Sequence, residues 1–153
     1  EPDHYRIGQA MLNLAIALRA SGDFTTAEDL FGQALERLAD RLGADHPQVA
    51  VAHTEMGTLW LETGRPDRAE AAFLRSLEIR RAALPDGHPH LAWSLAGLGR
   101  SMLASGRREE ALPLLREAVA IRQKALPAEN PLRLATEETL RDAERASALH
   151  SPR

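Results

Sequence analysis

The chain has 153 residues, of which 44% are hydrophobic, 27% charged and 4% aromatic, and its formal net charge is −3. Ala and Leu make up a third of the residues, which favours helices and argues against an all-β sandwich or barrel. Acidic and basic residues are interleaved, without the basic stripe that nucleic-acid binding requires. No apolar run approaches the roughly 18 residues of a membrane span, and the absence of Cys excludes disulfides, thiolate metal sites and thiol catalysis. The composition predicts an all-α cytoplasmic protein that binds neither nucleic acid nor membrane.

Apolar residues at three-and-four spacing predict a series of amphipathic helices. In the second of them, for example, Ala27, Phe31, Ala34 and Leu38 fall on one face. Within each pair of helices a Gly marks the turn, where a helix ends in a left-handed residue that Gly adopts at low cost. In chain order the helices are expected at about residues 5–20, 24–42, 47–62, 66–84, 89–104, 108–126 and 131–148.

The helix pairs repeat every 42 residues without a gap. Each linker ends in Pro, suited to the first position of a helix, preceded by His or Asn that can cap the new helix. No pair can bury its apolar face alone, so we expect a single domain over residues 1–153 in which neighbouring repeats stack. The repeats are expected at about residues 5–46, 47–88 and 89–130. The matching columns include His4, His46, His88 and Asn130; Pro47, Pro89 and Pro131; and Gly22, Gly64 and Gly106.

These columns resemble the tetratricopeptide repeat signature. A small residue, Ala15 in the first repeat, allows close approach of two helices. The 42-residue period, longer than the usual period of about 34, and the linker Asp45-His46-Pro47 are similar to the kinesin light chain class, which is common in bacterial signalling proteins. The resemblance implies a right-handed α-α superhelix of three helix-turn-helix repeats and a capping helix. The first repeat carries the signature as Leu14, Ala15, Leu18, Gly22, Ala27, Phe31 and Ala34.

The segment 131–148 is expected to cap the array. Arg141 stands where a continuing repeat would need a small residue, and Glu144 stands where it would need an apolar one. Polar side chains are expected to make the outer face of this helix soluble, as the end of a solenoid requires. They are Thr136, Glu137, Glu138, Asp142 and Arg145.

The start of the chain suggests a different expectation. Residues 1–4 align with the linker 43–46, and there is no initiator Met. We therefore expect a piece of a longer protein whose first repeat is uncapped, with a complete small protein as the alternative.

No catalytic, metal or cofactor site is expected. The linker His residues belong to successive repeats whose helices pack roughly 8 to 10 Å apart, too far to share one zinc ion. His53-Thr54-Glu55 matches only the first half of a deaminase signature, whose second half needs two Cys. Gly97 and Gly99 start like a dinucleotide fingerprint, without its third Gly or a preceding strand. The sequence therefore predicts a protein that is not an enzyme.

The resemblance implies that the first helices of the repeats line a concave groove for a peptide. Aromatic and Arg residues dominate binding hot spots, which makes Trp93 and Arg100 the foremost candidates. Alternatively, Trp93 fills a gap between repeats and Arg100 bonds Glu55 or Glu62. A carboxylate clamp for chaperone tails is matched only at Arg100. The predicted groove residues are Gln9, Leu12, Asn13, Ile16, Arg19, Val51, Thr54, Thr58, Leu61, Trp93, Ala96, Arg100 and Leu103; the packing face beside them is expected to carry Leu14, Ala15 and Leu18.

The predicted function is a protein–protein interaction scaffold whose groove binds a partner's peptide segment, apolar with some acidic character. One alternative is an architectural module that self-associates, as a homodimer through the uncapped N-terminal repeat or through its convex Ala-rich helices. Another is the substrate-recruiting tail of a bacterial signalling enzyme such as a Ser/Thr kinase.

Overall fold

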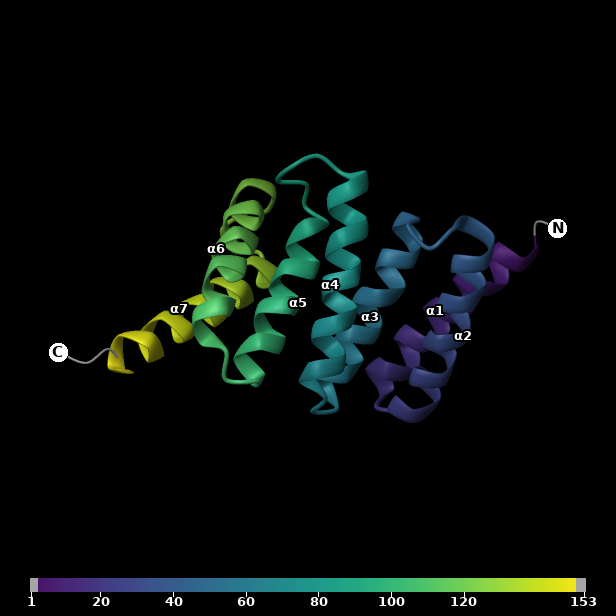
Figure 1. Cartoon of the computed structure of the whole chain (residues 1–153), viewed down its shortest axis with the longest axis horizontal. Coiled ribbons are helices and arrows are strands. Elements are labelled where there is room, and N and C mark those ends of the chain that lie inside the picture. The colour runs from purple at the N-terminus through teal and green to yellow at the C-terminus, as the bar shows by residue number, and fades with distance from the viewer. Residues whose placement is uncertain (1–2, 151–153) are drawn as a thin grey trace.

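Seven helices and the loops between them make up the part of the chain that the structure describes. This computed structural model describes residues 3–150, with side chains for residues 5–148, so Glu1, Pro2 and the His4 side chain of the first linker column lie outside it. The all-α prediction is confirmed. The helices are α1 (Asp3–Ser21), α2 (Phe24–Leu42), α3 (Pro47–Glu62), α4 (Pro66–Ala83), α5 (Leu91–Ala104), α6 (Arg108–Ala125) and α7 (Pro131–His150) (Figure 1).

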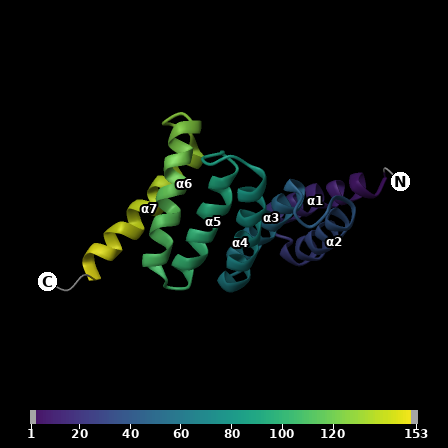
Figure 2. The ribbon, with the colours of Figure 1, turned by 45° about the horizontal axis from the view of Figure 1, so that its top comes forward.

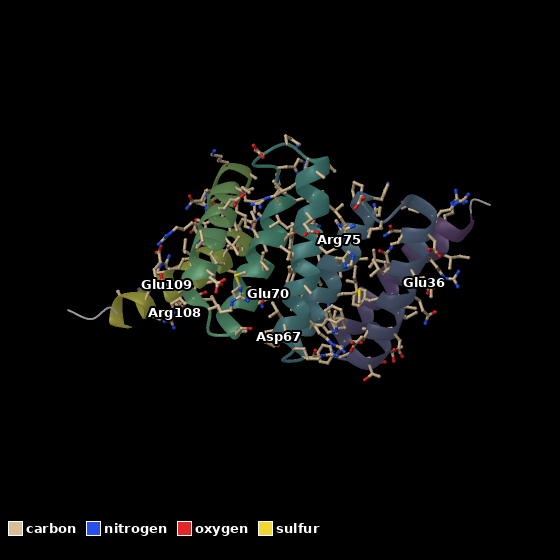
Figure 3. All side chains as sticks on the ribbon, in the orientation of Figure 1. Glu36, Asp67, Glu70, Arg75, Arg108 and Glu109 are labelled. Atoms are coloured by element: carbon tan, nitrogen blue, oxygen red, sulfur yellow. The ribbon has the colours of Figure 1, made fainter. Side chains whose placement is uncertain are left out.

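The helices are arranged in a row of antiparallel pairs with α1 and α7 at opposite ends, and the turned view of Figure 2 keeps this order. The first helices α1, α3, α5 and α7 contact one another in succession and form the inner layer. The second helices α2, α4 and α6 form the outer layer, which faces the viewer in Figure 3. This is the solenoid arrangement that the repeat period predicts.

The linkers cap the helices that follow them. The His46 Nδ1 accepts a hydrogen bond from Gln48 N at 3.1 Å, and the Asn130 Oδ1 accepts one from Leu132 N at 3.0 Å. These bonds satisfy backbone N–H groups that have no partner inside the helix, because the first turn offers none. The predicted capping role of this column is confirmed.

Helix α5 begins two residues later than the sequence predicts. His88 Nδ1 again accepts from the residue two positions on, His90 N, at 3.2 Å. Leu91 N then donates to His88 O at 2.9 Å and closes a tight turn around Pro89. The cap is therefore the same as in the other linkers, and only the regular helix starts later.

The turn glycines behave as predicted. Gly22, Gly64 and Gly106 have positive φ angles of 88°, 72° and 77°. Any side chain would strain this backbone, because L-residues with a Cβ adopt it at a cost.

The core consists of three clusters of buried residues that follow one another along the array. Its largest members are Phe31 and Phe73, which occupy the same column of successive second helices and are both buried. Trp60 packs against the core clusters of the first and second repeats, and Met102 packs against those of the second and third. The small-residue column is buried as well, at Ala15, Gly57 and Gly99.

Arginines join successive repeats along one edge of the array. Arg65, at the turn of the second repeat, bonds Glu28 of the first through both of its terminal nitrogens, at 2.9 and 2.7 Å. Arg107 repeats this contact to Glu70 at 2.8 Å (Glu70 is labelled in Figure 3). The hydrogen bond from Arg65 is the main reason that the pKa of Glu28 is lowered.

A second repeated contact joins each outer helix to the next inner helix. Arg80 Nη1 donates to His90 O at 2.8 Å and to Ser94 Oγ at 2.9 Å. Arg122, 42 residues later, makes the same two bonds, to Leu132 O and to the Thr136 hydroxyl. We call this contact the arginine–hydroxyl bridge. The junction between the first and second repeats lacks it, because the same columns hold Leu38 and Ala52, both buried.

The bridge corrects the sequence-based description of the capping helix. Thr136 was expected on the outer polar face, yet it is buried because it lies 42 residues after Ser94 and accepts a hydrogen bond from Arg122. Glu138, Asp142 and the other charged residues expected outside are exposed, except that Glu137 is half-buried beside Arg133.

Candidate peptide-binding groove

A hollow of about 440 Å³ lies on the inner layer between α3, α5 and α7. Five predicted groove residues line it, all from first helices: Thr54, Thr58, Trp93, Ala96 and Arg100. A sixth, Val51, lines a smaller adjoining hollow of about 190 Å³, which shares Thr54 and Trp93 with the large one. We call these two adjoining hollows the groove.

Trp93 stands at the centre of the groove. It is 46% exposed although both of its neighbours along α5, Ala92 and Ser94, are fully buried. It borders the large hollow, the adjoining one and a third of about 170 Å³. The Arg122 guanidinium lies over its ring at 5.2 Å from the centroid, which fixes the indole. Trp93 thus contacts the next repeat and still presents apolar surface to the groove.

Arg100 has no carboxylate partner among the described side chains. Glu55 and Glu62, the alternative partners that the sequence predicts for it, both bind Arg19, at 3.2 and 2.6 Å. The alternative in which Arg100 bonds one of them is therefore wrong. Arg100 is exposed and lines the hollow, so its charge faces the space that a ligand would enter.

Arg122 adds a second positive charge to the same wall. It is buried, and burial together with the nearby charge of Arg100 lowers its pKa to about 10. Its Nη1 makes the bridge to α7, while its Nε and Nη2 bond no side chain or carbonyl of the described residues. The lining of the hollow holds one acidic residue, Glu138. This end of the groove is therefore electropositive.

The predicted groove residues of α1 line neither the large hollow nor the adjoining one. Arg19 is paired with the two glutamates of α3, and Gln9 Nε2 donates to Asn13 Oδ1 at 3.3 Å. Burial raises the pKa of Glu55, and the Arg19 charge opposes this rise. Three further predicted groove residues are only partly exposed, because they pack against the core clusters: Ile16, Leu61 and Leu103.

The prediction for Leu12 is wrong, and so is the assignment of Leu14 to the packing face. Leu12 is fully buried in the core of the first repeat, whereas Leu14 is 52% exposed. The face of α1 that packs on α2 is therefore centred on Gly8, Leu12 and Ala15, one helical position away from the expected stripe. The error arose because Ala and Leu lie all round α1, so the apolar stripe has no sharp edge.

The wall formed by α6 and α7 was missed. Arg122, Thr136, Glu138 and Thr139 line the hollow, but the sequence assigned α7 to an outward-facing cap. The 42-residue spacing that places Arg122 after Arg80 and Thr136 after Ser94 was a signal that could have located them.

The described residues contain no group of His, Asp and Glu that could hold a metal ion. Within that same part of the chain, no helix is long and apolar enough to cross a membrane.

The stacked helix pairs and the concave groove define a helical-repeat protein of the class that presents a surface to protein partners. The profile of the tetratricopeptide repeat family matches residues 6–82 and 61–124. The chain belongs to this family. No curated protein sequence matches it.

Solved structures give a further comparison. One is from Podosopora anserina and is described as kinesin light chain with nearly identical TPR-like repeats; identity is 28%, with a TM-score of 0.83, over 95% of this chain and 68% of that one. BtubC (BKLC) from P. vanneervenii is 19% identical over 97% of this chain and 58% of its own, with a TM-score of 0.84. The Sgt2 TPR domain from Aspergillus fumigatus is 12% identical over 95% and 85%, with a TM-score of 0.70. The last two share the fold.

Proposed function

We propose that the chain is a protein-interaction scaffold whose groove binds an extended peptide segment of a partner. The observation that carries the proposal is the half-exposed Trp93 beside two guanidinium groups, Arg100 and Arg122, that have no carboxylate partner among the described residues. Exposed aromatic surface next to unneutralised Arg is typical of binding hot spots. The ligand segment therefore carries an apolar side chain for Trp93 and an acidic one for the arginines.

The position of the groove supports the same conclusion. A peptide in the large hollow would touch α3, α5 and α7 together, so its binding surface is assembled from successive repeats. Because the second and third repeats and the cap are joined by arginine–hydroxyl bridges, the groove is preorganised, which lowers the conformational cost of binding.

The proposal is tested by selecting binders from a displayed random peptide library. Selected peptides are expected to be enriched in one apolar and at least one acidic residue. Trp93→Ala and Arg100→Glu should each weaken their binding about tenfold or more. Arg41→Glu, a charge reversal on exposed α2 surface, is the matched control and should leave affinity unchanged.

Circular dichroism of both groove variants should match that of the wild type, because Trp93 and Arg100 are both exposed. If the selected peptides bind the Trp93→Ala, Arg100→Glu double variant as tightly as the wild type, the groove assignment is refuted.

Self-association is the second candidate function, because α1 exposes two large apolar side chains, Ile7 and Leu14. Sedimentation at increasing concentration separates the two candidates: a peptide receptor of this kind remains monomeric, whereas an architectural module dimerises.

A further inference from the structure

The exposed apolar side chains of α1 form a single stripe. Ile7 is 44% exposed and Leu14 is 52% exposed, and Ala10 and Ala17 are exposed between and beyond them. The spacing of three and four residues places all four on one face of the helix. The described charged residues of α1, Arg6 and Arg19, stand outside this stripe.

The same positions are covered in the next two repeats. Ile7 corresponds to Val49 and Leu91, which are each 1% exposed, and Leu14 corresponds to Met56, half-buried, and Leu98, 3% exposed. The Ala10 and Ala17 columns are buried in α3 and α5 as well. In those repeats the helix packs against the second helix of the preceding repeat, α2 or α4. The α1 stripe is therefore a repeat-packing face that no helix of the described residues covers.

We propose that this face binds the second helix of a further repeat, which packs on α1 as α2 packs on α3 and as α4 packs on α5. The occupant follows from continuity with the α2–α3 and α4–α5 interfaces, which use the same columns. This proposal is independent of the groove, which lies between α3, α5 and α7.

The α1 face also specifies one side chain of the helix that it binds. Where the later inner helix carries a hydroxyl, as at Ser94, the preceding helix carries Arg80; where it carries Ala52, the preceding helix carries Leu38. The corresponding residue of α1 is Ala10, which offers no acceptor to a guanidinium. The preceding helix therefore resembles α2 and places an apolar residue over Ala10.

A second column specifies charge. Arg65 and Arg107 bind Glu28 and Glu70 of the preceding repeat, but the corresponding residue of the first repeat is Asp23. A carboxylate facing Asp23 would be repelled, so the preceding helix is neutral or basic at the position of Glu28.

An extended chain tests the fit. A copy of residues 24–43, with Glu28→Lys in the copy, is joined directly before Pro2, so that the copied Gly43 takes the place of Glu1. The 42-residue register then sets the copied Leu38 over Ala10 and the copied Lys near Asp23. Hydrogen exchange of α1 amides should slow about tenfold or more relative to the unextended chain, because the new contact must break before α1 opens.

The matched control carries Leu38→Arg in the copy, which keeps length and helicity but buries a guanidinium against Ala10. It should lose most of the added protection. Unchanged exchange in the first extension, or equal protection in both, would overturn the proposal. A concentration-dependent dimer of the unextended chain that Leu14→Glu dissociates would overturn it in favour of a second copy as the occupant.

Discussion

Replacing Gly97 by Ala is expected to destabilise the protein, although Gly is a poor helix former. A Cβ built on Gly97 lies 2.2 Å from Phe73 Cε1, well inside van der Waals contact. The ring cannot retreat, because a Cβ on Gly57, against its opposite edge, would lie 2.9 Å from Cε2. Phe73 is 2% exposed and fills the space between α3 and α5, so relief requires movement of the backbone.

Two opposing effects set the magnitude. Gly→Ala inside a helix gains about 1 kcal/mol of helix propensity. Overpacking a filled core costs about 1 to 3 kcal/mol, and an overlap this deep puts Gly97→Ala at the upper end of that range. We expect a net loss of about 1 to 2 kcal/mol in the free energy of unfolding, which lowers Tm by roughly 2 to 8 °C for a chain of this size.

Thermal and urea unfolding followed by circular dichroism measure this loss. Gly32→Ala is the control, because a Cβ at this exposed α2 position meets nothing within 4 Å and the substitution should stabilise by up to about 1 kcal/mol. Phe73→Leu, which introduces the side chain that Leu115 carries in the same column, should relieve the overlap, so the double variant should lose less than the sum of the two single ones. If Gly97→Ala stabilises the protein as Gly32→Ala does, the overlap of a Cβ with the Phe73 ring is not the reason for Gly at position 97.

Two other predictions concern the junctions and pH. Ser94→Ala alone should lower the free energy of unfolding by about 1 to 3 kcal/mol, because it removes a hydrogen-bond acceptor from buried Arg80. Arg80→Leu combined with Ser94→Ala should lower it by less than the sum of the two single changes, since the first junction already uses Leu38 and Ala52 in these columns. Urea unfolding of the three variants measures these differences. Burial, helped by a neighbouring arginine, lowers the pKa of His53 below its ordinary 6.5, so protonation favours the unfolded chain and stability falls as pH drops through 6.5. His53→Gln should make the urea-unfolding midpoint depend less on pH between pH 7 and 5. If the midpoint of the variant changes with pH as much as that of the wild type, His53 is not the group responsible.

The sequence predicted the helices and their order because each boundary has a local cause. Gly22 and its equivalents end the first helix of each pair, and His46 or Asn130 begins the next pair through a side-chain cap. Repetition gave the stacking order as well, since a face that cannot be buried within one pair must be buried by the next.

The face of each helix was harder to predict than its limits. In α1, Leu12 and Leu14 are two residues apart and chemically identical, yet one is fully buried and the other half-exposed. The column of Leu14 is covered in α3 and α5, where a preceding repeat packs on it, and that information lies outside the helix itself. The predicted set of groove residues is incomplete for the same reason. Arg122 and Thr136 belong to the groove only because the arginine–hydroxyl bridge joins α6 to α7.

The two kinds of junction give the repeats a fixed order that a genetic deletion would reveal. Removing 42 residues, 47–88, would keep the period and set α2 directly before α5. The ion pair between successive repeats would be kept, because Glu28 would meet Arg107 in place of Arg65. The buried Ser94 would lose both Arg80 and Ser76, its present hydrogen-bond partners, and face Leu38 instead. Repeats of equal length are thus not interchangeable. A repeat can be removed without loss of stability only where the outer helix and the inner helix that are brought together carry matching side chains, either Arg with a hydroxyl or Leu with Ala.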